Sequence, residues 1–258
     1  MKKILILYFS GAGSVSTIVS FMKHKLSKHF HVEAYSLEKQ APHIGNYDAV
    51  IIGTPVYHAA PARLVSDYFD DLPQLLQKIP AFVFSAHGLH SLNTNRILAK
   101  QLAAKNIITI YDSAYRCPAS DGALIAPFIK RFFEFEKGIS KKVNRDLNMF
   151  LKALKQRPIG ASMPKFSFWS IVNAPNKAAS QHFMVKIHMD ENSCNGCGLC
   201  VRSCPHTALV HGKNKKSIKQ LKNCENCYRC VHHCPNAALS LFKRKTPKKL
   251  LVYKRKSD

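Results

Sequence analysis

A cysteine pattern occurs twice near the C-terminal end of this chain. Each copy reads C-x2-C-x2-C-x3-C-P, first over residues 194–205 and again over 224–235. The similarity extends beyond the cysteines at the same offset of 30 positions (224 − 194): Val201, Ala208 and Leu209 recur as Val231, Ala238 and Leu239. This repetition indicates that one half-module was duplicated.

The spacing within each copy predicts an iron–sulfur site. Three cysteines two residues apart can wrap one cube of iron and sulfide, while the fourth, set off by a turn of helix, reaches a second cube. Two copies therefore predict two [4Fe–4S] clusters with crossed ligation. We assign Cys194, Cys197, Cys200 and Cys234 to the first cluster, and Cys224, Cys227, Cys230 and Cys204 to the second.

Two other uses of these cysteines are weaker. A zinc site needs four ligands, usually as two CxxC pairs, and leaves the third cysteine of each copy without a role. A disulfide framework needs an oxidising compartment, and cysteines this close in sequence pair poorly in a packed module.

The stretch from about Val185 to Phe242 resembles the bacterial-type two-cluster ferredoxins, with every ligand cysteine present. The resemblance implies a small α+β domain over 185–242 and low-potential, one-electron transfer.

Length and composition limit the number of domains that the chain can form. At 258 residues with 46% hydrophobic content, it has room for one domain of ordinary size and a small second one. No apolar run approaches the ~18 residues that span a bilayer. Lys2 and Lys3 precede only six apolar residues, Ile4–Phe9, which is shorter than the core of a secretory signal. We therefore expect a first strand there, and a cytoplasmic protein whose thiols stay reduced.

The net charge of +24 is concentrated in the second half. Residues 1–130 carry 13 basic and 8 acidic residues, net +5, whereas 131–258 carry 26 and 7, net +19. A tail over 243–258 holds eight basic residues before its single acid, Asp258. Such a tail is usually a solvated segment. The functional alternatives are that it attracts an acidic redox partner, anionic lipid or nucleic acid. The sequence does not choose among these alternatives.

Residues 1–112 alternate short apolar runs with helix-period stretches, which predicts a parallel sheet with helices on both faces. The five expected strands are Ile4–Phe9, His31–Ser36, Ala49–Gly53, Ala81–Ser85 and Ile107–Tyr111. A helix capped by Asn93 or Thr94 should run to about Lys105. In such sheets ligands bind beyond the carboxyl ends of the strands, so the loops after the first, third and fourth strands carry the chemistry.

The first of these loops holds Ser10, Gly11, Ala12, Gly13, Ser14 and Val15, between a buried strand and an amphipathic helix. Glycines let the backbone curl around a phosphate, and the helix N-terminus offers free N–H groups. A tight turn with no ligand is the alternative. The loop is not a dinucleotide fingerprint, because Ser16 stands where the third glycine of that motif belongs.

The segments Tyr8–Gly13 and Gly53–Tyr57 resemble flavodoxin and its relatives. That resemblance implies a doubly wound α/β sheet that binds FMN, with the phosphate in the first loop and the flavin ring between the other two. By this analogy Tyr57 lies against the ring; the alternative is simple packing at the sheet edge. The second and third loops would contribute Thr54, Pro55, Val56, Tyr57, His87 and Gly88.

One departure from the family pattern concerns Ala12 and Val15, which stand where the family usually has hydroxyl-bearing side chains. Each hydrogen bond lost to a charged phosphate weakens binding by roughly 1.5–3 kcal/mol. Ser10, Ser14, Ser16 and Thr17 are the hydroxyls available to compensate.

The middle of the chain is less informative. Apolar residues keep a helical period from Pro127 to about Lys155, with Gly138 as a division between two helices. Cys117, the odd cysteine, is expected to be a buried free thiol, with a reactive role as the alternative. Pro158, Gly160, Pro164 and Pro175 mark a connector. Its apolar residues, which we expect to dock against a domain, are Phe166, Phe168, Trp169, Ile171 and Val172.

Taken together, the sequence predicts a flavodoxin-like domain over 1–157, a connector over 158–184, a ferredoxin domain over 185–242 and a basic tail over 243–258. The arrangement is similar to the flavodoxin–ferredoxin fusion proteins of anaerobic microbes, which implies an electron carrier or oxidoreductase that relays electrons between clusters and FMN. The alternative is a redox-sensing or binding protein with clusters, an empty flavin site and a basic surface for a polyanion. A flavin enzyme that reduces one small molecule is a third interpretation.

Overall fold

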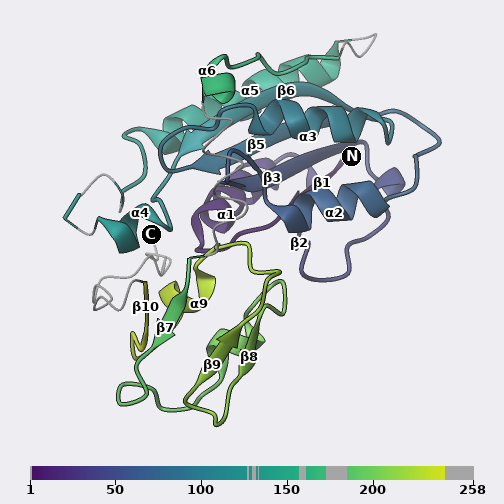
Figure 1. The fold of residues 1–258 in the computed structure, drawn as a ribbon. Coiled ribbons are helices and arrows are strands. Elements are labelled where there is room, and N and C mark those ends of the chain that lie inside the picture. The colour runs from purple at the N-terminus through teal and green to yellow at the C-terminus, as the bar shows by residue number, and fades with distance from the viewer. Residues whose placement is uncertain are drawn as a thin grey trace.

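The first half of the chain forms a parallel sheet, as its alternating pattern requires. The computed structural model describes residues 2–126, 128–129, 132, 134–156, 161–172 and 185–241. Its main sheet has the parallel order β2-β1-β3-β5-β6 (Figure 1). The strands are β1 (Lys3–Tyr8), β2 (His31–Ser36), β3 (Ala49–Tyr57), β5 (Ile79–His87) and β6 (Ile107–Arg116), and the short β4 (Ala60–Pro61) pairs antiparallel with β3. The predicted five-stranded doubly wound sheet is confirmed.

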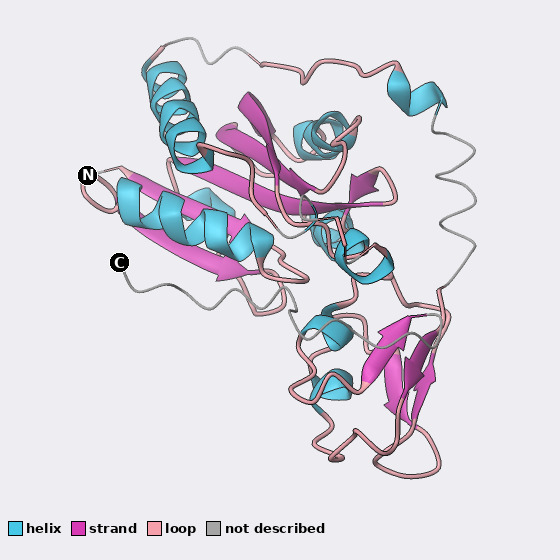
Figure 2. Cartoon of the chain, turned by 90° about the vertical axis from the view of Figure 1, so that its left-hand side faces the viewer, coloured by secondary structure: helices cyan, strands magenta, loops and turns pink. Residues whose placement is uncertain are grey.

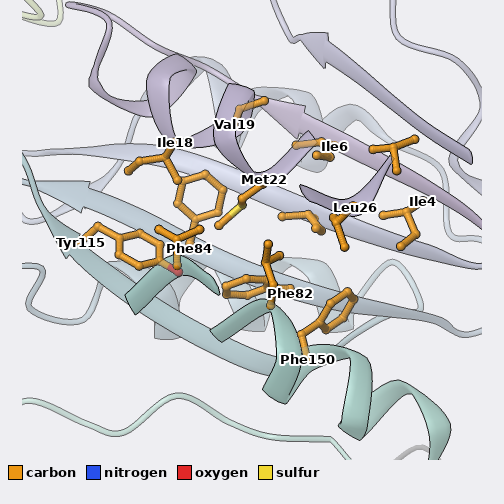
Figure 3. Packing of buried hydrophobic residues seen from close by; sticks show 14 of the residues in the cluster. Ile4, Ile6, Ile18, Val19, Met22, Leu26, Phe82, Phe84, Tyr115 and Phe150 are labelled. Atoms are coloured by element: carbon orange, nitrogen blue, oxygen red, sulfur yellow. The ribbon is translucent and has the colours of Figure 1, made fainter. Parts of the chain in front are cut away.

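Helices cover both faces of this sheet. Helices α1 (Ser14–Leu26) and α5 (Ile139–Lys155) pack on one face, against Phe82 and Phe84 among others (Figure 3). Helices α2 (Arg63–Asp71) and α3 (Thr94–Ala103) pack on the other, and a short 3-10 turn, η1 (Ile44–Asn46), joins that layer. Because the chain leaves β1 toward β2 on one side and returns to β3 on the other, the loops after β1 and β3 open at a switch point where ligands bind.

The helix expected over 127–155 is only half present. Helix α5 begins after Gly138, whose φ of 72° marks the predicted division. Of the residues before it, Pro127 lies outside the described part of the chain, and the described ones between 128 and 138 are irregular or in turns, apart from a single 3-10 residue at 132. The prediction of a helix between Pro127 and Gly138 is therefore wrong for the described residues. Helix α5 is fixed to β6 by the buried Asp146 carboxylate, which accepts hydrogen bonds from Tyr111, Ser113 and Tyr115.

The connector is tied to α3 through polar contacts. The Asn93 side chain does not cap its helix but accepts a hydrogen bond of 2.7 Å from the Ser167 N–H. Arg96 donates to the Pro164 carbonyl at 2.8 Å. The prediction that the connector's aromatic side chains pack against a domain is wrong, because Phe168 and Trp169 are 76% and 69% exposed, and the remaining three are exposed as well: Phe166, Ile171 and Val172. They flank or form the short α6 (Trp169–Val172). Pro158, Gly160 and Pro175 lie outside the described residues.

The second half is a small α+β unit that shows the sequence repeat. Two short antiparallel sheets form, β7–β10 and β8–β9, and two short helices connect strands of one sheet to strands of the other along the chain. The unit lies below the large sheet in Figure 2. The elements are β7 (Ile187–Met189), α8 (Leu199–Arg202), β8 (Leu209–His211), β9 (Ile218–Gln220), α9 (Arg229–His232) and β10 (Leu239–Leu241).

A shared hydrophobic cluster joins this unit to the first half. Leu124, in the short α4 (Gly122–Ile125), packs in the same cluster as Ile187, Tyr228 and Leu239. The basic tail from 243 onward is outside the described residues. Within the described ranges, no helix combines the length and apolarity that crossing a bilayer requires.

Candidate functional site

The three loops singled out from the sequence meet at one pocket at the carboxyl ends of β1, β3 and β5. Ten of the twelve predicted flavin-site residues line it: Ser10, Gly11, Ala12, Ser14, Val15, Pro55, Val56, Tyr57, His87 and Gly88. The other two, Gly13 and Thr54, do not. Thr54 is fully buried within β3, which continues past the predicted end at Gly53, and its hydroxyl accepts a hydrogen bond from the N–H of Ala62, the N-cap residue of α2.

The loop after β1 forms a cradle of backbone N–H groups. Within the described chain, the N–H groups of residues 11–15 have no hydrogen-bond acceptor, and the first turn of the 13-residue helix α1 lies among them. Free N–H groups and the positive end of a helix favour an anion such as a phosphate. The cradle therefore suits the FMN phosphate even without side-chain hydroxyls at Ala12 and Val15.

Most of the hydroxyls that could compensate are engaged inside the loop. Ser10 Oγ accepts a hydrogen bond of 3.1 Å from the Ser16 N–H. The hydroxyls of Ser16 and Thr17 both donate to the Gly13 carbonyl. Ser14, which lines the pocket with only a long contact of 3.5 Å to the Pro118 carbonyl, is the hydroxyl best placed for a ligand.

Gly11 and Tyr57 approach each other so closely that a side chain at position 11 would force Tyr57 or the loop to move. A methyl group on Gly11 would lie 2.1 Å from Tyr57 Oη and 3.5 Å from Cβ of Cys227. The Tyr57 side chain thus stands at the boundary between the phosphate loop and a cysteine of the second repeat. Tyr57 lines the pocket. Stacking of its ring on the flavin remains a prediction.

At the end of β5, His87 brings a neutral imidazole to the pocket. Burial lowers the pKa of His87 to about 4, with Lys142 and His90 adding to the effect against Glu136. Its Nδ1 is buried without a hydrogen-bond partner among the described residues. An unpartnered buried nitrogen beside a ligand cavity is suited to a polar group of the ligand.

The sequence did not single out the loop after β6 as part of this site. Residues 117–121 line the pocket, and Cys117 among them is a buried free thiol, as predicted. Burial raises the pKa of the Cys117 thiol, which keeps it protonated and unreactive. The extension of β6 to Arg116 carries this loop over the pocket, and nothing in the residue pattern indicates that extension.

The eight remaining cysteines surround two separate small cavities. Cys194, Cys197, Cys200 and Cys234 line one, and Cys204, Cys224, Cys227 and Cys230 line the other. Each set combines three cysteines of one repeat with the fourth of the other repeat, which is the grouping that crossed ligation requires. Among the described residues no group of His, Cys, Asp or Glu converges as a site for a single metal ion. Four thiols around each cavity are the donor set that a [4Fe–4S] cluster takes.

Backbone N–H groups already point at the predicted ligand sulfurs. The Ala208 N–H donates to Cys204 Sγ at 3.2 Å, and the Ala238 N–H, its counterpart in the repeat, donates to Cys234 Sγ at 3.3 Å. Hydrogen bonds to thiolates stabilise negative charge and so tune a cluster's reduction potential.

The two cavities differ in exposure. Cys197 of the first set is exposed, whereas Cys227 and Cys230 of the second are only 8% and 6% exposed. We call them the outer and the inner cavity. The inner one lies against the first half of the chain, since Cys227 is the cysteine that approaches Gly11.

Polar contacts fix this approach. Arg229 donates to the carbonyls of Ser10, at 2.7 Å, and of Gly11, at 3.1 Å, and pairs with both carboxylate oxygens of Glu38. Its guanidinium also lies 5.2 Å from the centre of the Phe9 ring. Glu225 accepts from the Arg63 N–H, and His232 contacts the Ser120 carbonyl at 2.7 Å. The sequence-based interpretation missed this interface.

Sheet order, anion cradle and cysteine-lined cavities together define an electron-transfer protein of the flavin and iron–sulfur class. Residues 5–113 match the model of the flavodoxin domain, and residues 186–236 match that of the 4Fe-4S dicluster domain. The chain joins an N-terminal flavodoxin domain to a C-terminal dicluster ferredoxin domain. The first implies FMN and the second implies two [4Fe–4S] clusters.

Solved structures with a similar fold align with the flavodoxin half. A flavodoxin from the domain Archaea is 12% identical, with a TM-score of 0.43 over 60% of this chain and 99% of that one. Flavodoxin 1 from Bacillus cereus is 13% identical, with a TM-score of 0.43 over 58% and 97%. An FMN-bound flavodoxin from Fusobacterium nucleatum is 12% identical, with a TM-score of 0.41 over 59% and 98%. No curated protein matched the sequence.

Proposed function

We propose that this protein relays electrons between its two [4Fe–4S] clusters and FMN, as an electron carrier or as an oxidoreductase that passes them to a further acceptor. Each cluster exchanges one electron at a time, and FMN, when bound, holds one or two. Two one-electron transfers through the clusters therefore balance one full reduction of the flavin.

The observation that carries the proposal is the pocket wall shared by the two domains. Asn226 and Tyr228, which flank the inner-cavity ligand Cys227, line the same pocket as the phosphate loop and His87. A cluster in the inner cavity and a flavin in the pocket are then separated by little more than side chains. The proposed order is outer cluster, inner cluster, flavin.

In this role the residues of the chain hold and orient the cofactors. The N–H groups of residues 11–15 bind the phosphate, and Tyr57 and the β6 loop shield the pocket from water. The neutral His87 imidazole is available to hydrogen-bond the flavin ring, and the crossed cysteine sets hold the clusters.

The outer cavity is suited to electron exchange with an acidic redox protein. Lys215 lines it, and both Lys215 and Lys216 are exposed beside Gly196. Positive charge next to an exposed cluster attracts an acidic partner and orients it for transfer. The nine free cysteines suit a reducing compartment such as the cytoplasm, which we include in the proposal.

The test is a cofactor count on anaerobically purified protein, with iron, sulfide and released flavin measured on one sample. About eight irons with about one FMN, and bleaching of both chromophores by a single low-potential donor, are expected. About eight irons with no flavin after incubation with FMN would overturn the relay and favour the redox-sensing or binding protein.

A further inference from the structure

The two cysteine loops of the ferredoxin domain form an internal comparison, because they share one backbone conformation. Gly196 and Gly198 of the first loop have φ of 74° and 68°. Thirty positions later, Asn226 and Tyr228 have φ of 54° and 56°. The duplicated module thus keeps two left-handed positions in each loop, with glycine in one copy and larger side chains in the other.

Left-handed backbone favours glycine, and among other residues asparagine tolerates it best. A tyrosine there is unfavourable, since its Cβ meets the neighbouring carbonyl oxygen. Such residues persist where the side chain has a role that a glycine cannot fill. The role of the Asn226 and Tyr228 side chains must be specific to the second loop (residues 224–230, the inner loop), because the first loop (194–200, the outer loop) has glycine at both positions.

The inner loop differs from the outer one where it faces the flavodoxin domain. Arg229 replaces Leu199 and grips the carbonyls of the phosphate loop, and Glu225 replaces Asn195 and accepts from the Arg63 N–H. Asn226 and Tyr228 line the flavin pocket itself. The changes between the repeats therefore concentrate on the side of the flavin.

We infer that Asn226 and Tyr228 are flavin-contacting residues, so that the ferredoxin domain supplies one wall of the FMN site. The inference rests on the proposed function. A tyrosine offers an apolar ring and a phenolic donor, and an asparagine offers both donors and acceptors, which suits a flat heterocycle with polar edges. The flavodoxin domain alone then holds an incomplete site, and flavin affinity depends on a folded inner loop.

The test restores the glycines of the outer loop. Asn226→Gly and Tyr228→Gly each relax the backbone at a left-handed position. Because Tyr228→Gly also removes a buried ring that packs in the cluster with Leu124 and Leu239, the urea unfolding of each variant is compared with that of the wild type. Ala237→Gly is the matched control, because Ala237 has φ of 50° in the same half-module but does not line the pocket. FMN is titrated into flavin-free protein by fluorescence quenching, and iron and sulfide are counted on the same samples.

The expected result is a dissociation constant for FMN raised about tenfold or more in both pocket variants, unchanged in Ala237→Gly, with about eight irons in all three. An unchanged dissociation constant in pocket variants that keep their iron overturns the inference, and so does weakening confined to variants that have lost iron. If the wild-type protein binds no FMN, the proposed relay itself fails, which distinguishes the two outcomes.

Discussion

The Arg229 guanidinium and the Glu38 carboxylate form an ion pair that joins the two domains, although 191 residues separate them in the sequence. The arginine is the first residue of α9, directly after the inner cysteine loop, and the glutamate follows β2 at the open end of the sheet. Their side chains are 9% and 29% exposed. Because Arg229 also bonds the phosphate-loop carbonyls, it positions the inner cluster relative to the flavin pocket.

Removing Arg229 should loosen the domains. Arg229→Met leaves Glu38 and three carbonyls, those of Ser10, Gly11 and Ser203, without their donor. The expected cost is about 2–4 kcal/mol, since breaking a fully buried pair costs about 3–5. Anaerobic urea unfolding measures the loss. Arg202→Met is the control, because Arg202 bonds a carbonyl within its own loop, that of Cys197. Equal losses in the two variants would contradict the positioning role.

Crossed ligation makes a prediction about distant cysteines. Cys234→Ser should remove the outer cluster, whose other ligands precede Cys234 by 34 or more positions (234 − 200), and should spare the inner one. Iron content should fall to about half, with electron paramagnetic resonance of the reduced protein showing one cluster. Cys117→Ser should keep both. Loss of the inner cluster instead would show that each repeat ligates its own cube.

The contact between Gly11 and Tyr57 should make position 11 intolerant of a side chain. Gly11→Ala should weaken FMN binding by about tenfold or more, or about 1.4 kcal/mol, because the new methyl displaces Tyr57 or the phosphate loop. Adding Tyr57→Phe removes the atom in closest conflict and should recover part of the affinity. If the double variant recovers no FMN affinity, the loss in Gly11→Ala comes from distortion of the loop after β1 and not from the contact with Tyr57.

His87 should contribute to acid sensitivity. Its pKa is about 4 in the folded protein because of burial, against about 6.5 when unfolded. Between these values the unfolded chain binds the extra proton, so stability falls as pH decreases from 6.5 toward 4. At pH 5 the loss due to His87 is about 1–2 kcal/mol, allowing for partial exposure.

Replacing this histidine gives the measurement. The unfolding free energies of His87→Gln and the wild type, compared at pH 7 and pH 5, should differ in pH dependence by that amount. The exposed His29→Gln serves as the control. A wild-type pH dependence in His87→Gln would mean that the imidazole titrates normally.

Charge at the outer cavity should govern the reaction with a partner. Lys215→Glu with Lys216→Glu should slow reduction by an acidic two-cluster ferredoxin about tenfold at low salt, and the difference should shrink as salt is added. Lys141→Glu with Lys152→Glu makes the same charge change on α5 and should have a small effect. Equal slowing by both pairs would indicate a net-charge effect and no docking site.

The sequence predicted the sheet, the three loops and the grouping of cysteines because each has a local pattern. The alternation of apolar runs predicts the positions of the strands, and the fixed spacing of the cysteines predicts which four hold each cluster. The contacts of Arg229 and Tyr228 have no such pattern, since they depend on how two domains meet. Their one signal was comparative: they replace Leu199 and Gly198 of the other repeat.

The errors have physical causes as well. The stretch before Gly138 had a helical period, but the chain there returns toward β6, where the Glu136 N–H bonds the Arg116 carbonyl. The connector residues around Phe168 are apolar, yet Asn93 and Arg96 anchor the segment through its backbone and leave the rings outside. Apolarity alone does not specify which surface, if any, a segment covers.

The unequal exposure of the two cysteine-lined cavities sets an order of damage. Oxidants and chelators reach Cys197 from solvent, while Cys227 and Cys230 are buried. We therefore expect air to destroy the outer cluster first. Under the proposed relay, such a molecule would keep the inner cluster and the flavin and would lose only the entry point for electrons, so that rebuilding one solvent-facing cluster would restore it.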